Sequence, residues 1–220
     1  GGEISTPNID RLASNGVRFT QFYNEQRCCP SRAVFMTGRY PHQVGIGAMI
    51  DAYDKWIRDE ANSSAYQDHL STDSPTIAEL LRAAGYHTMM CGKWHLGSRP
   101  AEWPCKRRFD RSFVLIPGAM NYYGGETVGP RTPMALDDQR FVPPHDGFYS
   151  TDAFTDYAVK FLDEAKPMTK PFFLYLAYNA PHWPLQAPQE DIDKYIGAYA
   201  GGWQATRVKR FDRRVELGVQ

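Results

Sequence analysis

The chain has 220 residues, 42% of them hydrophobic, which is enough for one domain with a sizeable core. Its 25 basic and 25 acidic side chains balance, which argues against a nucleic-acid-binding protein and means that any anion site must be local. No apolar run is long enough to span a bilayer. No Cys-x-x-Cys pair of the structural zinc type occurs among the four cysteines, and a Cys91–Cys105 disulfide stays an open possibility.

The first predicted elements are a helix and a strand. Thr6 is the expected N-cap, Pro7 occupies the first turn, and Gly16 ends the helix after apolar residues at helical spacing. Residues 17–23 are a strand candidate that leads to Cys28.

The segment that follows carries the main candidate site, Cys28-Cys29-Pro30-Ser31-Arg32. The Pro-Ser-Arg step predicts a helix start, because proline tolerates the first helical position, and the helix extends to about Arg39. The first N–H groups of this helix and the Arg32 guanidinium would attract an anion next to a cysteine. This pairing of a nucleophile with an anion cradle suits attack on a charged ester.

Residues 45–73 have no clear hydrophobic period and are predicted to be a long surface excursion. Ser74-Pro75 then starts a helix whose apolar face is expected to be Ile77, Leu80, Leu81 and Ala84. Residues 86–91 form the next strand. This helix–strand step is typical of an α/β unit.

At the end of that strand the chain reads Gly92-Lys93-Trp94-His95-Leu96-Gly97. Ligand sites of open α/β sheets lie at the carboxyl ends of strands, so Lys93 and His95 are candidate site residues. A Walker-type phosphate loop is excluded, because Trp94 stands where serine or threonine is required and His87 where a glycine is required.

The third candidate strand end comes after a helix that Thr151 is expected to cap. The apolar face of this helix is predicted to be Phe154, Tyr157, Ala158, Phe161 and Leu162. Residues 171–178 are continuously apolar, which predicts a central strand buried on both faces, and His182 follows it in a Pro-His-Trp-Pro step. Residues 205–217 predict a basic helix with a solvated face.

With C-x-P-S-R at Cys28, Thr-Gly-Arg at residues 37–39, Gly-Lys-Trp-His-Leu-Gly at residues 92–97 and Pro-His-x-Pro at residues 181–184, the chain resembles the sulfatase family. The resemblance covers nearly the whole chain. It implies an alkaline phosphatase-like α/β/α sandwich with a mostly parallel central sheet, of which residues 1–220 are one part of the catalytic domain. We expect the strand with the paired metal aspartates upstream of Gly1, and further metal ligands and a second lysine beyond Gln220.

The resemblance also implies a mechanism. Cys28 is oxidised to formylglycine, whose hydrate attacks the sulfur of a sulfate ester; the alcohol leaves, and loss of a proton from the second hydroxyl reforms the aldehyde as sulfate departs. Arg32 holds the formylglycine, Lys93 contacts the sulfate, His95 assists deprotonation, and His182 contacts the sulfate and protonates the leaving oxygen. The family cofactor is Ca²⁺, to which Cys28 contributes as formylglycine, with the other ligands outside this chain.

The implied partners are a sulfated small molecule or glycan as substrate and the formylglycine-generating machinery during maturation. Nucleic acid and a membrane span are not expected. The resemblance implies a periplasmic, secreted or lysosomal-type compartment.

Three other interpretations remain. The first is a phosphonate or phosphate ester hydrolase of the same superfamily, and the second is a truncated, inactive sulfatase-like protein. The third, a cysteine hydrolase that uses the Cys28 thiolate, leaves the motifs at residues 92–97 and 181–184 unexplained.

Overall fold

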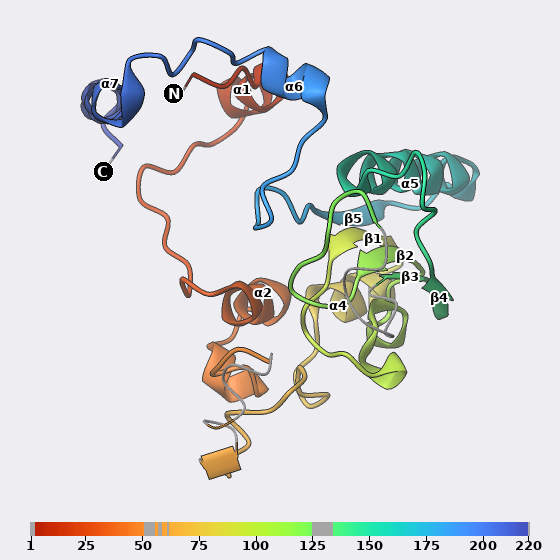
Figure 1. Cartoon of the computed structure of the whole chain (residues 1–220). Helices are drawn as coiled ribbons and strands as arrows, with labels where there is room; N and C mark the ends of the chain where they lie inside the picture. Colours follow the sequence, from red (N-terminus) through yellow and green to blue (C-terminus); the bar gives the residue numbers. More distant parts are fainter. Residues whose placement is uncertain (1–2, 51–55, 57–58, 61, 125–133, 220) are drawn as a thin grey trace. The chain divides into compact units, whose positions relative to one another are not determined.

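The computed structural model describes residues 3–50, 56, 59–60, 62–124 and 134–219 (Figure 1). The chain divides into two compact units. One comprises residues 25–186, and the other combines residues 1–24 with residues 187–220.

The larger unit contains a five-stranded sheet in the order β4-β3-β2-β1-β5. Its strands are β1 (His87–Lys93), β2 (Arg111–Leu115), β3 (Met134–Leu136), β4 (Gln139–Phe141) and β5 (Phe172–Ala177). β1 is parallel to both β2 and β5, whereas β3 and β4 continue the sheet in antiparallel fashion. The two strands predicted at residues 86–91 and 171–178 are confirmed, and the sheet is mixed.

Helices cover both faces of this sheet. On one face α5 (Ser150–Ala165) packs on a core that includes Met89 and Cys91 of β1, and Figure 1 shows it running along the strands. On the other face Met90 shares a core with α2 (Cys28–Thr37) and α4 (Ile77–Ala83). Neighbouring strand residues therefore point to opposite cores, as the pleat requires. The predicted α/β/α sandwich is confirmed.

The position predicted for β5 is wrong. Among the described strands it pairs with β1 alone and forms an edge of the sheet, and Phe172 is 54% exposed. A continuous apolar run indicates a strand, but it does not reveal how many neighbours the strand has.

The helices differ in how well their limits were predicted. α5 buries Phe154, Ala158 and Phe161 as expected, whereas Tyr157 and Leu162 are only partly buried. Its N-cap is Tyr149 rather than Thr151. The N-cap of α4 is Thr76 rather than Ser74, and its buried side chain is Ala78, whereas Leu80 is 60% exposed. A capping box explains the start of α4: Thr76 accepts from the backbone N–H of Glu79, whose carboxylate accepts from the Thr76 N–H.

Residues 45–73 are not simply a surface excursion. Ile46 and Met49 are buried in the core shared with α2, and Ile46 forms a β-bridge with Tyr66. Residues 51–55, 57, 58 and 61 of this segment lie outside the described residues. Short 3-10 helices complete the larger unit at Pro41–Val44, Pro100–Glu102, Pro104–Arg107 and Lys166–Met168.

The smaller unit is helical. Its helices are α1 (Pro7–Ser14), α6 (Gln189–Asp193) and α7 (Gly202–Glu216), and none has a buried residue. The backbone N–H of Ser5 donates to the Tyr195 hydroxyl at 3.4 Å, and Arg210 donates to the Glu3 carboxylate at 2.9 Å. The helices at residues 7–14 and 202–216 are confirmed. The strand predicted at residues 17–23 is wrong, because this segment is an exposed irregular chain.

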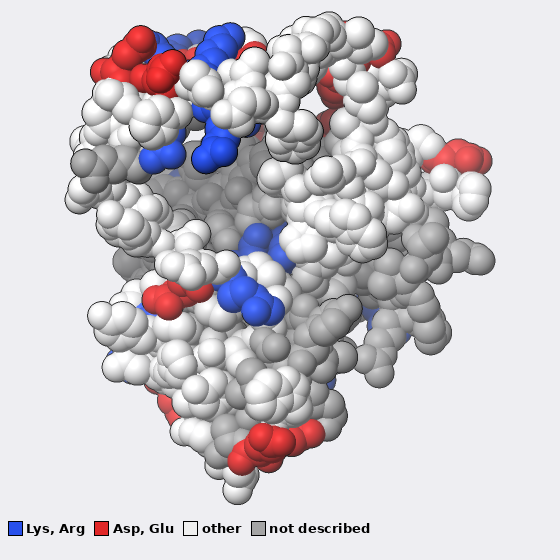
Figure 2. Space-filling view, turned by 60° about the vertical axis from the view of Figure 1, so that its left-hand side comes forward, with Lys and Arg blue, Asp and Glu red and all other residues white. Residues whose placement is uncertain are grey.

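Figure 2 shows basic and acidic side chains in separate small groups on the described part of the face in view. Among the described residues, no helix combines the length and the apolar composition needed to cross a bilayer.

Candidate active site

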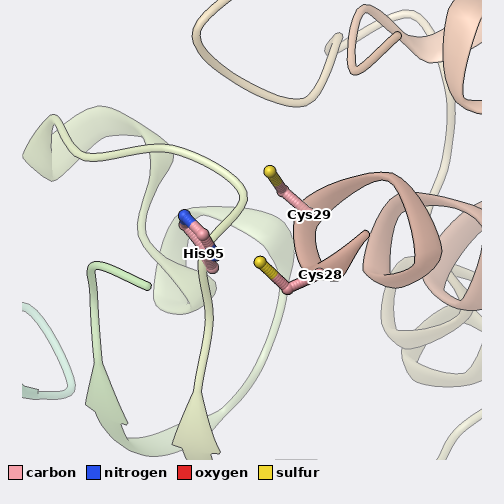
Figure 3. Close-up of side chains that lie close together, drawn as sticks. All are labelled: Cys28, Cys29 and His95. Carbon is pink, nitrogen blue, oxygen red and sulfur yellow. The ribbon is translucent and has the colours of Figure 1, made fainter. Parts of the chain in front are cut away.

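The two adjacent cysteines lie in the first turn of α2. Cys28 is half-buried and Cys29 is fully buried. Figure 3 shows the Cys28 side chain projecting from α2 toward the segment that carries His95. A ligand atom of each of Cys28, Cys29 and His95 lies within 4.8 Å of the other two. α2 starts at Cys28 itself, two residues before Pro30, which was the predicted start.

Lys93 and His95 are placed by the end of β1. The N–H groups of Trp94 and His95 donate to the carbonyls of Leu115 and Ile116, which extends the β1–β2 pairing beyond the strand. The Trp94 indole, itself buried, donates to the Glu102 carbonyl at 3.0 Å. Lys93 and His95 are each only 2% exposed.

Glycines allow the close backbone packing at this site. Gly92 has φ +112°, and a Cβ there would lie 2.1 Å from the carbonyl oxygen of Ala177 on β5. A Cβ on Gly118 would lie 2.6 Å from Cε1 of His95. His95 itself has φ 55°, a left-handed conformation that is uncommon outside glycine. The His95 ring thus packs directly on Gly118, and any larger residue at position 118 would displace the ring.

The environment stabilises a thiolate at Cys28. Hydrogen bonding from Cys29, then hydrogen bonding and charge from His95, and the charge of Lys93 lower the pKa of Cys28 to about 3, against the opposing effect of burial. Burial lowers the pKa of Lys93, and the Arg32 charge adds to this effect, whereas the nearby Cys28 opposes it. The charges of Lys93 and His95 therefore act directly on the Cys28 thiolate.

Arg32 links the helix to two strands. Its Nη1 donates to the Lys93 carbonyl at 2.5 Å and to the Tyr175 hydroxyl at 3.2 Å. Phe35, one turn along α2, stacks on the Tyr175 ring with centroids 5.6 Å apart. Burial raises the pKa of Tyr175, so its hydroxyl stays protonated. Arg32 thus fixes the strand end that carries Lys93.

His182 follows β5 in a separate turn and is exposed. Its Nδ1 donates to the Trp183 carbonyl at 2.6 Å, and its own carbonyl accepts from the Tyr122 hydroxyl at 2.8 Å. Since a carbonyl only accepts, Nδ1 carries the proton and Nε2 is the position left for a ligand or substrate. Within the described residues, the hydrogen bonds of His182 do not join it to Cys28, Lys93 or His95.

The Thr-Gly-Arg sequence at the end of α2 has a structural role. Gly38 adopts φ 66° and its N–H donates to the Val34 carbonyl, which ends the helix. The Thr37 hydroxyl donates to the Ala33 carbonyl at 2.7 Å, and Arg39 is exposed.

Sequence reasoning missed three residues that support the site. The Met49 Sδ lies 3.7 Å from the Cys28 sulfur and 3.3 Å from the Cys29 sulfur. Met49 was missed because its segment has no periodic pattern that would indicate burial. Tyr175 was missed because it lies in a uniformly apolar strand. Gly118 was missed because the residue on which it packs, His95, is distant in sequence.

The described residues around the Cys28 thiol do not by themselves form the calcium site that the resemblance implies. Calcium binds six to eight oxygen atoms, whereas the groups around Cys28 are two sulfurs and an imidazole. The other cluster of metal-ligand type among the described residues is Asp68, His69 and Glu102, and Arg99 already pairs with both of its carboxylates.

Comparisons with known proteins agree with these features. The sulfatase family model matches residues 1–216. An uncharacterised sulfatase of Schizosaccharomyces pombe is 38% identical over the whole chain, and an arylsulfatase of Klebsiella aerogenes is 34% identical over the whole chain. The chain spans 41% and 47% of the length of these two relatives.

Solved structures show the same fold. A crystal structure of Ps i-CgsB in complex with k-i-k-neocarrahexaose is 35% identical with a TM-score of 0.71, over 86% of this chain and 43% of that one. BT4656 in complex with its substrate D-glucosamine-2-N,6-O-disulfate is 29% identical with a TM-score of 0.68, over 90% of this chain and 34% of that one. The chain belongs to the sulfatase family.

Proposed function

We propose that this chain contributes the nucleophile and the anion-binding end of a sulfuric ester hydrolase of the arylsulfatase type. The observation that supports it most directly is the Cys28 thiol in the first turn of α2, with buried Lys93 and His95 against it. A helix N-terminus and a buried ammonium together favour an anion at that point.

Cys28 is the residue to be converted to formylglycine. This group supplies, as its hydrate, an oxygen nucleophile for the sulfur of a sulfate ester. Cys28 fits the conversion, because its side chain is half-buried rather than enclosed. The described residues around Cys28 do not themselves offer the oxygen donors that calcium needs.

The other site residues have separate roles in sulfate binding, proton transfer and positioning. Lys93 binds a sulfate oxygen. Burial lowers the pKa of Lys93 and so disfavours its ammonium form, and a bound anion would offset this effect. His95 takes the proton from the hydroxyl formed at position 28. Arg32 holds the Lys93 backbone in place, and His182 offers Nε2 to the leaving oxygen.

We propose a sulfated sugar or small sulfate ester as the substrate class. Support comes from the family and from BT4656, whose complex contains a disulfated glucosamine. The formylglycine-generating machinery is the proposed maturation partner, and a periplasmic, secreted or lysosomal-type compartment is the proposed location.

Production of the chain together with formylglycine-generating machinery tests the proposal. Mass spectrometry of the Cys28 peptide is expected to find aldehyde in place of thiol, and nitrophenyl sulfate is expected to be hydrolysed. Cys28→Ala should abolish both signals, whereas Cys105→Ser, a change at a cysteine outside the site, should preserve them.

Competing interpretations give different results in the same assay. Faster hydrolysis of a nitrophenyl phosphate or phosphonate would favour the related phosphoester activity. Aldehyde without turnover of either ester would favour an inactive, sulfatase-like chain. Hydrolysis that survives Cys28→Ala would refute the assignment of the nucleophile.

A further inference from the structure

The donors around Cys28 form a compact group of soft ligands. We define the sulfur cluster as Cys28, Cys29, Met49 and His95. The Met49 sulfur lies 3.7 Å from the Cys28 sulfur and 3.3 Å from that of Cys29. The two thiol sulfurs and an imidazole nitrogen of His95 lie within 4.8 Å of one another.

These separations suit a small four-coordinate metal ion. Metal–sulfur bonds of about 2.3 Å at tetrahedral angles place two sulfur ligands roughly 3.8 Å apart. The distances of 3.7 and 3.3 Å from Met49 to the two cysteines are close to this value. Met49 is thus within reach of an ion held by both cysteines, and His95 lies within 4.8 Å of both cysteine sulfurs.

The chemistry of the donors selects the metal. Calcium requires oxygen ligands, and Mg²⁺ does too, so neither suits two thiols, a thioether and an imidazole. Thiolates and an imidazole suit zinc as well as copper(I), but the usual zinc ligands are thiolate, imidazole and carboxylate, so the Met49 thioether favours copper(I). The Irving–Williams order disfavours Mn²⁺ and Fe²⁺.

The surroundings also suit a copper(I) complex. Two thiolates and one Cu⁺ leave one net negative charge, which the neighbouring Lys93 ammonium compensates. The N–H of Ile50 points at the Cys29 sulfur with a separation of 3.4 Å, a support of the kind that orients metal ligands. Cys29 and Met49 are buried, so water competes weakly for the ion.

We propose that the chain whose Cys28 is still a thiol has a copper(I) site made by Cys28, Cys29, Met49 and His95. Each thiol that is still protonated releases its proton to solvent as its sulfur binds, and copper stays in the +1 state throughout. This site is independent of the proposed ester hydrolysis. A metal held there also covers the sulfur that conversion to formylglycine must reach.

The test uses the whole chain from a host that lacks formylglycine-generating machinery. Under anaerobic conditions, copper(I) is supplied as a complex with a coloured chelator, and the copper retained by the protein is measured by competition. One copper per chain is expected. X-ray absorption should show sulfur as the main scatterer together with a nitrogen ligand.

Matched variants separate the sulfur cluster from other sulfur in the protein. Met49→Leu conserves volume and should weaken copper binding by at least about tenfold, and Cys29→Ser by about a hundredfold. Met36→Leu, in the same core, and Cys105→Ser should bind as the unmodified chain does. Circular dichroism checks that each variant is folded, and Met49→Leu keeps the test decisive if Cys29→Ser does not fold.

Two outcomes would overturn the site: no copper retained against the chelator, or equal affinity in Met49→Leu and Met36→Leu. A converted sample adds a separate reading, since copper binding should fall in proportion to the aldehyde at position 28. Absence of aldehyde or of ester turnover would count against the proposed hydrolase and leave the copper measurement unaffected.

Discussion

The position of His95 is fixed by its backbone conformation, a backbone hydrogen bond and close packing of its ring on Gly118. Its backbone takes a left-handed φ of 55°, its N–H bonds to the Ile116 carbonyl, and its ring packs on Gly118. The geometry of the Cys28 cluster therefore depends on a glycine that carries no functional group.

Gly118→Ala is expected to displace the His95 ring, because the new Cβ would lie 2.6 Å from Cε1. Overpacking of this kind costs about 1–3 kcal/mol of stability. The pKa of Cys28 should rise as the His95 contribution weakens. Imidazole NMR signals measure the ring displacement, thermal unfolding measures the loss of stability, and the pH dependence of Cys28 alkylation measures the pKa. Gly16→Ala, whose Cβ would meet only the Leu12 carbonyl, is the control, and an unmoved His95 signal in Gly118→Ala would contradict the prediction.

Alkylation reports the charge of Cys28 directly. Because its pKa is about 3 in the folded chain, the thiolate is present from about pH 5 to pH 8 and the rate with iodoacetamide should be flat over that range. In urea the pKa returns to about 8.5, so the rate should rise with pH. Cys91, whose pKa burial raises to about 12, should not react in the folded state. A native rate that climbs tenfold per pH unit would disprove a thiolate at Cys28.

At the scale of elements, α4 is fixed by one carboxylate. Glu79 closes the capping box with Thr76 and accepts from Nε of Arg107 at 2.8 Å. Arg107 is buried and also donates to the carbonyls of Leu70, Ser71 and Ser74. This arginine joins the 45–73 segment to the helix, which explains why that segment packs into the core.

Glu79→Gln should therefore lose stability in a pH-dependent way. Burial alone would raise the pKa of Glu79, but the hydrogen bonds from Arg107 and Thr76 outweigh it and lower the pKa. A carboxyl with a lowered pKa stabilises the fold above its unfolded value of about 4.3, and this contribution is lost as the pH falls through the folded pKa. We expect a deficit of about 1–2 kcal/mol near neutral pH.

Urea unfolding at a series of pH values measures this deficit, which should shrink below about pH 4. Asp152→Asn, at an exposed carboxylate in the first turn of α5, is the control. A deficit that is constant with pH would show that packing, and not the Glu79 charge, explains the loss.

At the scale of the whole molecule, residues 25–186 contain every described strand of the sheet, the two described cores and all five predicted site residues. The helices of the smaller unit bury no residue of their own. The stabilising burial of apolar area is thus concentrated in one unit.

A chain of residues 25–186 is expected to unfold cooperatively, with a midpoint within about 3 °C of that of the whole chain. A chain of residues 25–170, which lacks β5 and its pairing with β1, is the control and should not fold. Calorimetry and alkylation of Cys28 would follow the fold and the site. Loss of the cooperative transition in the 25–186 chain would show that the two units fold as one.

Local sequence by itself predicted strands at residues 86–91 and 171–178, close to the observed β1 and β5, and the amphipathic helix α5. It also named Cys28, Lys93 and His95 as candidate site residues, because periodicity and short motifs are local properties. The edge position of β5, the burial of Met49, the clamp from Arg32 to Tyr175 and the fit of Gly118 to His95 came only from the tertiary structure. Each joins residues far apart in sequence. Contacts of that kind depend on how the chain packs, which no local pattern records.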